Sequence, residues 1–111
     1  MTECSCLTPP FNYQDFDSKD IGVDETNGRY GSVTIETCKK CGANWLRYLV
    51  EYEAFSKSGR WYRGLIWPER ATVIKPETAL AELESLDWYF AGGSYFDSTG
   101  FKTSGPPAAD P

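Results

Sequence analysis

Alternating apolar and polar positions define the central part of the chain. Residues 32–37 alternate and are rich in β-branched side chains, which predicts a strand that runs directly into Cys38. Residues 45–55 and 60–67 give the strongest signal, and the Ser-Lys-Ser-Gly segment at 56–59 is typical of the turn of a β-hairpin. The pattern therefore predicts an antiparallel sheet in the middle of the chain.

Two loop lengths fit this hairpin. Both place each side chain on the same face of the sheet, because their registers differ by two residues. We expect the more apolar face to meet the core, and it would carry Leu46, Tyr48, Val50, Tyr52, Ala54, Trp61, Arg63, Leu65 and Trp67. The other face would carry Trp45, Arg47, Leu49, Glu51, Glu53, Phe55, Arg60, Tyr62, Gly64 and Ile66. Arg47 and Arg63 would therefore point to opposite sides of the sheet.

One helix is predicted after the hairpin. Pro76 suits the first turn of a helix, and Glu77 suits its positive N-terminal end. An apolar stripe follows at helical spacing, made of Ala79, Leu80, Leu83 and Leu86, with Phe90 at its end. Gly92 and Gly93 would stop the helix or the turn after it.

The two flanks look different from this centre. Residues 15–31 are polar, acidic and glycine-containing, which predicts a loop anchored by Ile21 and Val23. The proline-rich segment 103–111 has too few apolar side chains to bury and is predicted to be a disordered tail. We therefore predict a single domain, residues 1–102, of the α+β class: an antiparallel sheet of three to five strands with one packed helix.

Four cysteines in two close pairs are the main chemical signal. Cys4 and Cys6 lie near the start, Cys38 and Cys41 lie in the middle, and the chain has no histidine. Four thiolates suit one tetrahedral Zn²⁺ and leave it no open coordination position, which predicts one structural zinc per chain. The alternatives to a metal site are buried small side chains, two disulfides or a dithiol redox pair.

The cysteine region resembles zinc ribbons and zinc knuckles. The resemblance covers the Cys-Lys-Lys-Cys-Gly segment at 38–42 with its flanking strands, and Gly42 stands where the chain must turn back past the metal. The first pair is Cys-x-Cys instead of Cys-x-x-Cys, and 31 residues separate Cys6 from Cys38. The resemblance implies a four-cysteine zinc knuckle that pins the N-terminus, and as an alternative function it implies nucleic-acid binding.

The spacing of the four cysteines is also similar to the zinc centre of the bacterial redox-regulated holdase chaperone. In that family oxidation ejects zinc, forms two disulfides and unfolds a linker, and this activates the chaperone. Carried over, the resemblance implies a redox-responsive zinc switch made of Cys4, Cys6, Cys38 and Cys41. In that family, however, a large domain precedes the zinc centre.

Charge argues against a nucleic-acid partner as the first choice. The net charge is −5, although residues 32–70 carry seven basic and four acidic side chains and are thus locally at +3. The basic centre comprises Lys39, Lys40, Arg47, Lys57, Arg60 and Arg63. Neutralisation of zinc thiolates and cross-strand ion pairs account for these residues, because the charges are not expected to form one patch.

Aromatic residues make up 15% of the chain and are the candidates for a contact surface. The candidate partner contacts are Trp45, Phe55, Tyr62, Tyr89 and Tyr95, and we expect some of these five to stay exposed. The aromatic segment 88–101 is part of the same hypothesis. No catalytic constellation is recognisable. No signal peptide or membrane-spanning run is recognisable either, so the prediction is a cytoplasmic, non-enzymatic protein-interaction or regulatory module of undetermined oligomeric state.

Overall fold

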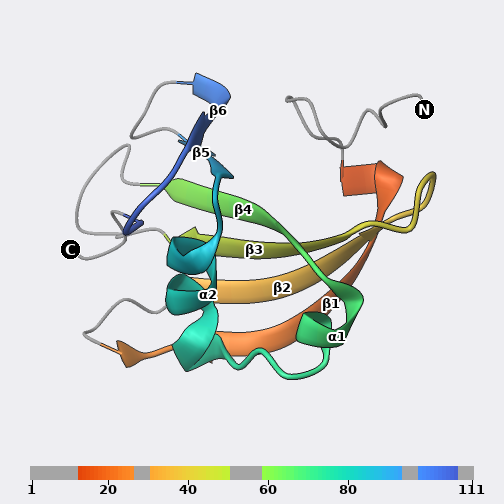
Figure 1. The fold of residues 1–111 in the computed structure, drawn as a ribbon, viewed down its shortest axis with the longest axis horizontal. Helices are drawn as coiled ribbons and strands as arrows, with labels where there is room; N and C mark the ends of the chain where they lie inside the picture. Colours follow the sequence, from red (N-terminus) through yellow and green to blue (C-terminus); the bar gives the residue numbers. More distant parts are fainter. Residues whose placement is uncertain (1–12, 27–30, 51–58, 94–97, 108–111) are drawn as a thin grey trace.

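The computed structural model describes residues 13–26, 31–50, 59–93 and 98–107, and these form one antiparallel sheet whose strands follow the chain in order (Figure 1). The strands are β1 (Phe16–Asp24), β2 (Gly31–Cys38), β3 (Asn44–Val50), β4 (Arg60–Ile66), β5 (Tyr89–Gly93) and β6 (Ser98–Thr103). The helices are α1 (Pro68–Ala71) and α2 (Ala79–Ser85), with short 3₁₀ turns η2 (Tyr13–Asp15) and η4 (Pro76–Thr78).

The predicted fold class is wrong, because six strands form the sheet and both α-helices are short. Residues 15–31, predicted as a loop, contain β1. This strand lies at the edge of the sheet, and the four residues that follow Phe16 in it are exposed, so its sequence shows no apolar alternation. Residues 89–93, predicted as the end of a helix, form β5 instead.

The register between β3 and β4 reverses the predicted faces of β4. Tyr48 lies opposite Tyr62, and Leu46 lies opposite Gly64. This register differs from both predicted ones by an odd number of residues, and an odd shift turns every side chain of a strand to the other face. Tyr62 and Ile66 therefore join the core with Tyr48, whereas Trp61, Arg63 and Leu65 lie on the opposite face with Trp45.

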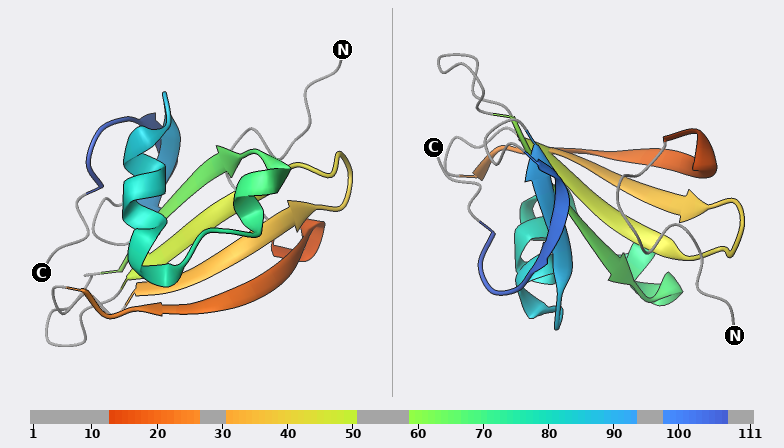
Figure 2. Two further views of the ribbon diagram at one scale, coloured as in Figure 1. Left: turned by 60° about the horizontal axis from the view of Figure 1, so that its bottom comes forward. Right: turned by 90° about the horizontal axis from the view of Figure 1, so that it is seen from above.

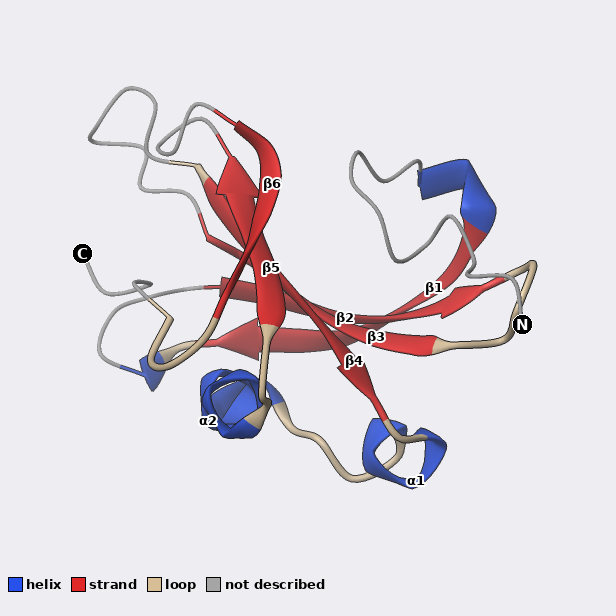
Figure 3. Ribbon diagram, turned by 45° about the horizontal axis from the view of Figure 1, so that its top comes forward, coloured by secondary structure: helices blue, strands red, loops and turns tan. Residues whose placement is uncertain are grey.

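Both α-helices lie on one side of the twisted sheet, as Figure 2 shows from two directions. The core on this side is built from Val33, Ile35, Leu46, Tyr48, Val50, Tyr62, Ile66, Ile74, Ala79, Leu83, Tyr89 and Ala91. Three tyrosine rings cross it in succession, with centroids 6.5 Å apart between Tyr48 and Tyr62 and 6.2 Å between Tyr62 and Tyr89. Figure 3 shows β5 and β6 running steeply across the direction of β1 to β3.

A buried carboxylate anchors one end of this core. The Tyr48 hydroxyl donates a hydrogen bond of 2.7 Å to Asp24, which is 1% exposed, and the backbone N–H of Thr26 donates to the same carboxylate. Gly31 lies directly against the Tyr48 ring, where a β-carbon would overlap with it. The glycine is therefore required by the position of this ring.

The helix prediction is confirmed at its start. Pro76 opens η4, which continues directly into α2, and the stripe residues Ala79 and Leu83 are fully buried. The helix ends at Ser85, because Leu86 is already extended. Only Asp87 and Trp88 separate Leu86 from Tyr89, where β5 begins, so Phe90 belongs to the sheet and does not continue the helical stripe.

Ordered contacts extend past the predicted domain end at residue 102. Thr103 pairs with Tyr89 as the last residue of β6, and the carbonyl of Gly105 accepts a hydrogen bond of 2.8 Å from the Tyr89 hydroxyl. Residues 108–111 of the predicted tail lie outside the described residues. Within the described part of the chain, no helix has the length and apolar character needed to cross a membrane.

Tyr89 generates a pH-dependent prediction. Burial, with a smaller contribution from the nearby Glu84 carboxylate, raises the pKa of Tyr89 above its usual value. Because the folded pKa of Tyr89 is higher than the unfolded one, its protonated hydroxyl contributes to the free energy of unfolding. This contribution is complete below about pH 10, the unfolded pKa, and is lost as pH rises through the folded pKa. We expect urea-unfolding free energies to fall above about pH 10.

Tyr89→Phe separates this effect from general alkaline denaturation. The variant should lose about 1 kcal/mol at pH 7, because its hydrogen bond to Gly105 is gone. Its stability should then decline less steeply than that of the wild type as pH rises through the alkaline range. Parallel curves for the two proteins would contradict the assignment to Tyr89.

Candidate binding pocket beside the cysteine turn

The turn between β2 and β3 holds two of the four cysteines. We call residues 38–42 the cysteine turn. The N–H of Gly42 donates to the carbonyl of Cys38, and the N–H of Cys38 donates to the carbonyl of Ala43, both at 2.9 Å. Gly42 has a φ of 77°, the left-handed conformation that favours glycine. The order of strand, Cys-x-x-Cys-Gly and strand expected from the sequence is therefore present.

The two cysteines of the turn differ in exposure. Cys38 is 2% exposed and packs on the sheet face opposite the helices, whereas Cys41 is exposed. Cys4 and Cys6 lie outside the described residues. Among the residues that the structure describes, no group of three or more histidine, cysteine or acidic side chains is arranged to hold a metal ion.

The start of the described chain lies beside the cysteine turn. Phe16, the first residue of β1, is opposite Cys38, and the N–H of Lys39 donates a hydrogen bond of 2.9 Å to the carbonyl of Asp15. The segment that carries Cys4 and Cys6 joins the described chain at η2, immediately before this contact. The antiparallel pairing of β1 with β2 thus places η2, the first described element, at the same end of the sheet as the cysteine turn.

A second apolar cluster covers the sheet face opposite the helices. Its buried members are Phe16, Cys38, Trp45 and Phe90, and Ala43, Trp61, Leu65 and Trp88 pack against them. Within this cluster Arg63, which is 3% exposed, forms an ion pair with Glu36. The Arg63 guanidinium also lies 4.1 Å from the centre of the Phe16 ring and 5.1 Å from that of Trp45.

This arrangement changes the interpretation of the basic residues. Arg47 lies opposite Arg63 in the register, so the prediction that they point to different faces is wrong. Arg63 is nevertheless enclosed by aromatic rings and paired with Glu36, which removes it from any surface patch. Lys39 and Lys40 are exposed on the cysteine turn, and Lys57 lies outside the described residues. The basic side chains available to an anion are fewer than the sequence indicates.

Three of the predicted partner contacts are buried instead of exposed. Trp45 is 0% exposed, and Tyr62 and Tyr89 are each 1% exposed, because all three pack within the two clusters. Phe55 and Tyr95 lie outside the described residues. In this fold, Trp45, Tyr62 and Tyr89 hold the sheet together and do not present a contact surface.

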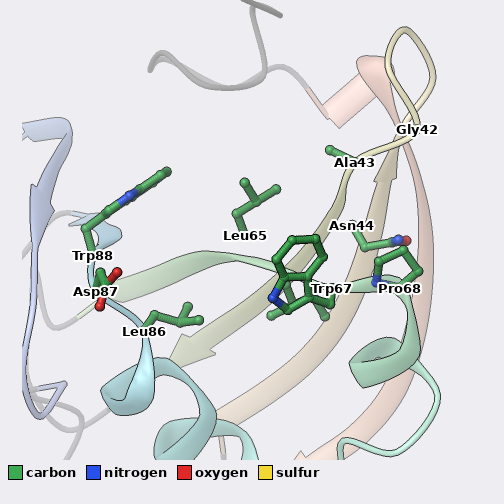
Figure 4. Close-up of a pocket in the computed structure, with 10 residues that line it drawn as sticks. Gly42, Ala43, Asn44, Leu65, Trp67, Pro68, Leu86, Asp87 and Trp88 are labelled. Atoms are coloured by element: carbon green, nitrogen blue, oxygen red, sulfur yellow. The ribbon is translucent and has the colours of Figure 1, made fainter.

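The exposed aromatic side chain that stands out is Trp67, at 75%. It borders a pocket of about 440 Å³, which we call the tryptophan pocket. The pocket is lined by Gly42, Ala43, Asn44, Leu65, Ile66, Trp67, Pro68, Leu86, Asp87 and Trp88. Figure 4 shows the indoles of Trp67 and Trp88 on either side of Leu65.

The pocket opens where β4 separates from β5. Over its whole length β4 pairs with β3, but β5 pairs only with residues 61–63. Residues 65 and 66 thus continue beyond β5, and the space beside them is bordered by the chain that links α2 to β5 and by the end of the cysteine turn. The strand divergence therefore positions the pocket.

The two tryptophans at the pocket are held differently. Trp88 packs edge-on against Trp45 and Phe90, with ring centroids 6.5 and 5.4 Å away, and the Lys102 ammonium lies 4.6 Å from its ring centre. Trp67 follows the last residue of β4 and precedes Pro68, which begins α1. One wall is thus anchored in the core, whereas the other projects into solvent.

The sequence contains part of the signal for this pocket. Trp88 belongs to the aromatic segment expected to contact a partner, but the predicted register of β4, which is wrong, places Trp67 on the core face. Spacing along the chain does not predict that both line one pocket, since this follows only from the divergence of β4 and β5. The Trp-Pro sequence at a strand end is the one local signal for an exposed ring.

Comparisons with protein-family models, with curated proteins and with solved structures find no match for this chain.

The buried ion pair predicts a strong effect of removing one charge. Glu36→Gln keeps the shape of the side chain but leaves the Arg63 guanidinium without its carboxylate in a buried site. We expect a loss of about 3 kcal/mol in the free energy of unfolding. Chemical denaturation followed by tryptophan fluorescence would measure it.

A double variant provides the control. Replacing both charges by apolar side chains, with Glu36→Leu and Arg63→Met together, leaves neither charge of this pair in the buried site and should cost less than Glu36→Gln alone. If the double variant is the less stable of the two, the ion pair is itself a net source of stability and the stated mechanism is wrong.

Proposed function

We propose that this protein is a small, zinc-stapled, non-enzymatic interaction module that binds another protein at the tryptophan pocket. The observation that carries the proposal is the pocket itself, in which a tryptophan that is 75% exposed borders an apolar cavity of about 440 Å³. Tryptophan is among the residues that contribute most to protein interfaces, and large rings left in water favour burial by a partner.

Binding fits the lining of the pocket better than catalysis does. Asp87 is the one ionisable side chain among its ten lining residues, and Asn44 adds an amide. General acid–base or nucleophilic catalysis needs an activated group with a second polar group that orients it, and the lining supplies no such pair. We therefore infer recognition of a partner surface.

The zinc proposal concerns the stability of the same site. Cys4, Cys6, Cys38 and Cys41 would supply four thiolates to one Zn²⁺. The proposal is supported by the contacts of Lys39 and Phe16, which place the start of the described chain beside the cysteine turn. Gly42 and Ala43, which follow Cys41, line the tryptophan pocket. A metal at the turn would thus fix one wall of the pocket. A cytoplasmic location, which keeps thiols reduced, belongs to the same proposal.

Cys41→Ser is the sharpest test of the metal. Because Cys41 is exposed, its replacement by serine should be nearly neutral in the absence of a metal. With zinc bound, we expect loss of one metal equivalent by elemental analysis and a large drop in thermal stability. Lys39→Ala, an exposed change in the same turn, serves as the control and should keep both.

Oxidation separates a structural zinc from a switch. Mild peroxide should leave one zinc bound and the four thiols protected if the metal is structural. Zinc release with loss of all four thiols, reversed by reductant, would instead support the redox-responsive alternative. Purified protein that holds no zinc at all would overturn the metal proposal and leave the pocket proposal standing.

The pocket proposal predicts a selective loss of binding in Trp67→Ala. Since Trp67 is exposed, the variant should fold normally, with a thermal midpoint within a few degrees of the wild type. Phe101→Ala removes a second exposed ring that does not line the pocket. In affinity capture with quantitative mass spectrometry, proteins retained by the wild type and by Phe101→Ala should be lost with Trp67→Ala. Equal retention by all three would refute the assignment of the site.

A further inference from the structure

We propose that the tryptophan pocket takes a basic side chain of the partner, with an aliphatic stem and a cationic head, as in arginine, lysine or methylated lysine. This inference rests on the proposed function of the pocket as a protein-binding site. Three features of the pocket carry it: the charge of its lining, the exposed face of Trp67 and the apolar surface between the two indoles.

The charge of the lining selects a cation. Asp87 is the one acidic side chain among the lining residues, and it is exposed. Within the described part of the chain it takes part in no ion pair, whereas Arg70 is bound to Glu82 and Arg63 to Glu36. The net charge of −5 adds a long-range attraction for basic partners. An acidic or phosphorylated segment would meet repulsion at the same place.

An aromatic face is available for the cationic head. Trp67 is 75% exposed, and tryptophan is the side chain that attracts cations most strongly through its ring face. The Lys102 ammonium already lies 4.6 Å from the ring centre of Trp88, so the Trp88 ring already interacts with a cation. The geometry therefore points to Trp67 as the ring that receives the head, while the Asp87 carboxylate, which lies beside Trp88, attracts it across the pocket.

The apolar surface suits the stem of such a side chain. Leu65 lies between the two indoles, and Leu86 adjoins Asp87 in the sequence and in the lining (Figure 4). Methylene groups of an arginine or lysine would bury against these leucines while the charge stays near the mouth. A purely apolar side chain would cover the same surface but would desolvate the Asp87 carboxylate without replacing its water contacts, which is unfavourable.

A pair of peptides that differ only in charge tests the inference. The probes are a capped Ala-Arg-Ala tripeptide and its Ala-citrulline-Ala counterpart, in which a neutral urea replaces the guanidinium. The chain has four tryptophans, so the indole N–H region of a ¹⁵N spectrum has four signals, and Trp67→Phe and Trp88→Phe assign two of them. Both peptides are titrated into the full-length protein at low salt.

The expected result is a saturable shift of the Trp67 and Trp88 signals with the arginine peptide, and binding between about two- and thirty-fold weaker with the citrulline peptide. Asp87→Asn should weaken binding of the arginine peptide several-fold and bring the two peptides closer together. Asp17→Asn, which removes an exposed carboxylate of β1 outside the pocket, is the matched control and should leave the affinity unchanged.

Three contrary results overturn the inference in distinguishable ways. Equal binding of both peptides at the two tryptophans would show an apolar docking site, which refutes the cationic occupant but keeps the proposed function. Shifts with the arginine peptide that persist in Trp67→Ala would place the cation elsewhere and also refute it. If neither peptide moves the two signals, the basic occupant is refuted, and affinity capture with Trp67→Ala decides the proposed function independently.

Discussion

The pairing of Tyr48 with Tyr62 is the constraint on which the rest of the molecule depends. It decides which side chains of β4 face the helices and which face the opposite side. With this register, Tyr62 and Ile66 complete the core beneath α2, and Trp61, Arg63 and Leu65 turn to the other face. A slip by one residue would exchange these sets and place Arg63 beneath the helix, out of reach of Glu36, which lies on the opposite face.

The side chains on the two faces of the sheet are buried by different kinds of contact. The helix side has a continuous apolar core, into which α2 inserts Ala79 and Leu83. The other side has aromatic rings around a buried ion pair, so Phe16 and Trp45 contact the Arg63 guanidinium directly. The arginine brings methylene groups and a planar cation that stacks on rings, which lets a charged residue fill space in an aromatic cluster.

Sequence patterns predicted the elements that have one buried face. The strand at 32–37, the two central strands and the start of the helix at Pro76 all alternate or repeat at the expected period. The pattern failed for β1, whose exposed edge position leaves little alternation, and for β5, which is buried along nearly its whole length and resembles the end of an apolar helix.

The candidate site was harder to predict, because alternation alone does not fix the pairing of two strands when the turn between them can have several lengths. The exposure of Trp67 and the burial of Trp45 and Tyr62 follow from that pairing, whereas the cysteine spacing needs no register and identified the turn that borders the pocket.

The strand order has a consequence for how the chain folds. Each strand pairs with its neighbour in the sequence, so the sheet has no crossover connection, and the longest link between described neighbours is residues 67–88 with both helices. Proteins rich in such local contacts fold faster than sandwiches of similar size with long crossovers. The sheet can therefore grow outward from the hairpin of β2 and β3, one strand at a time.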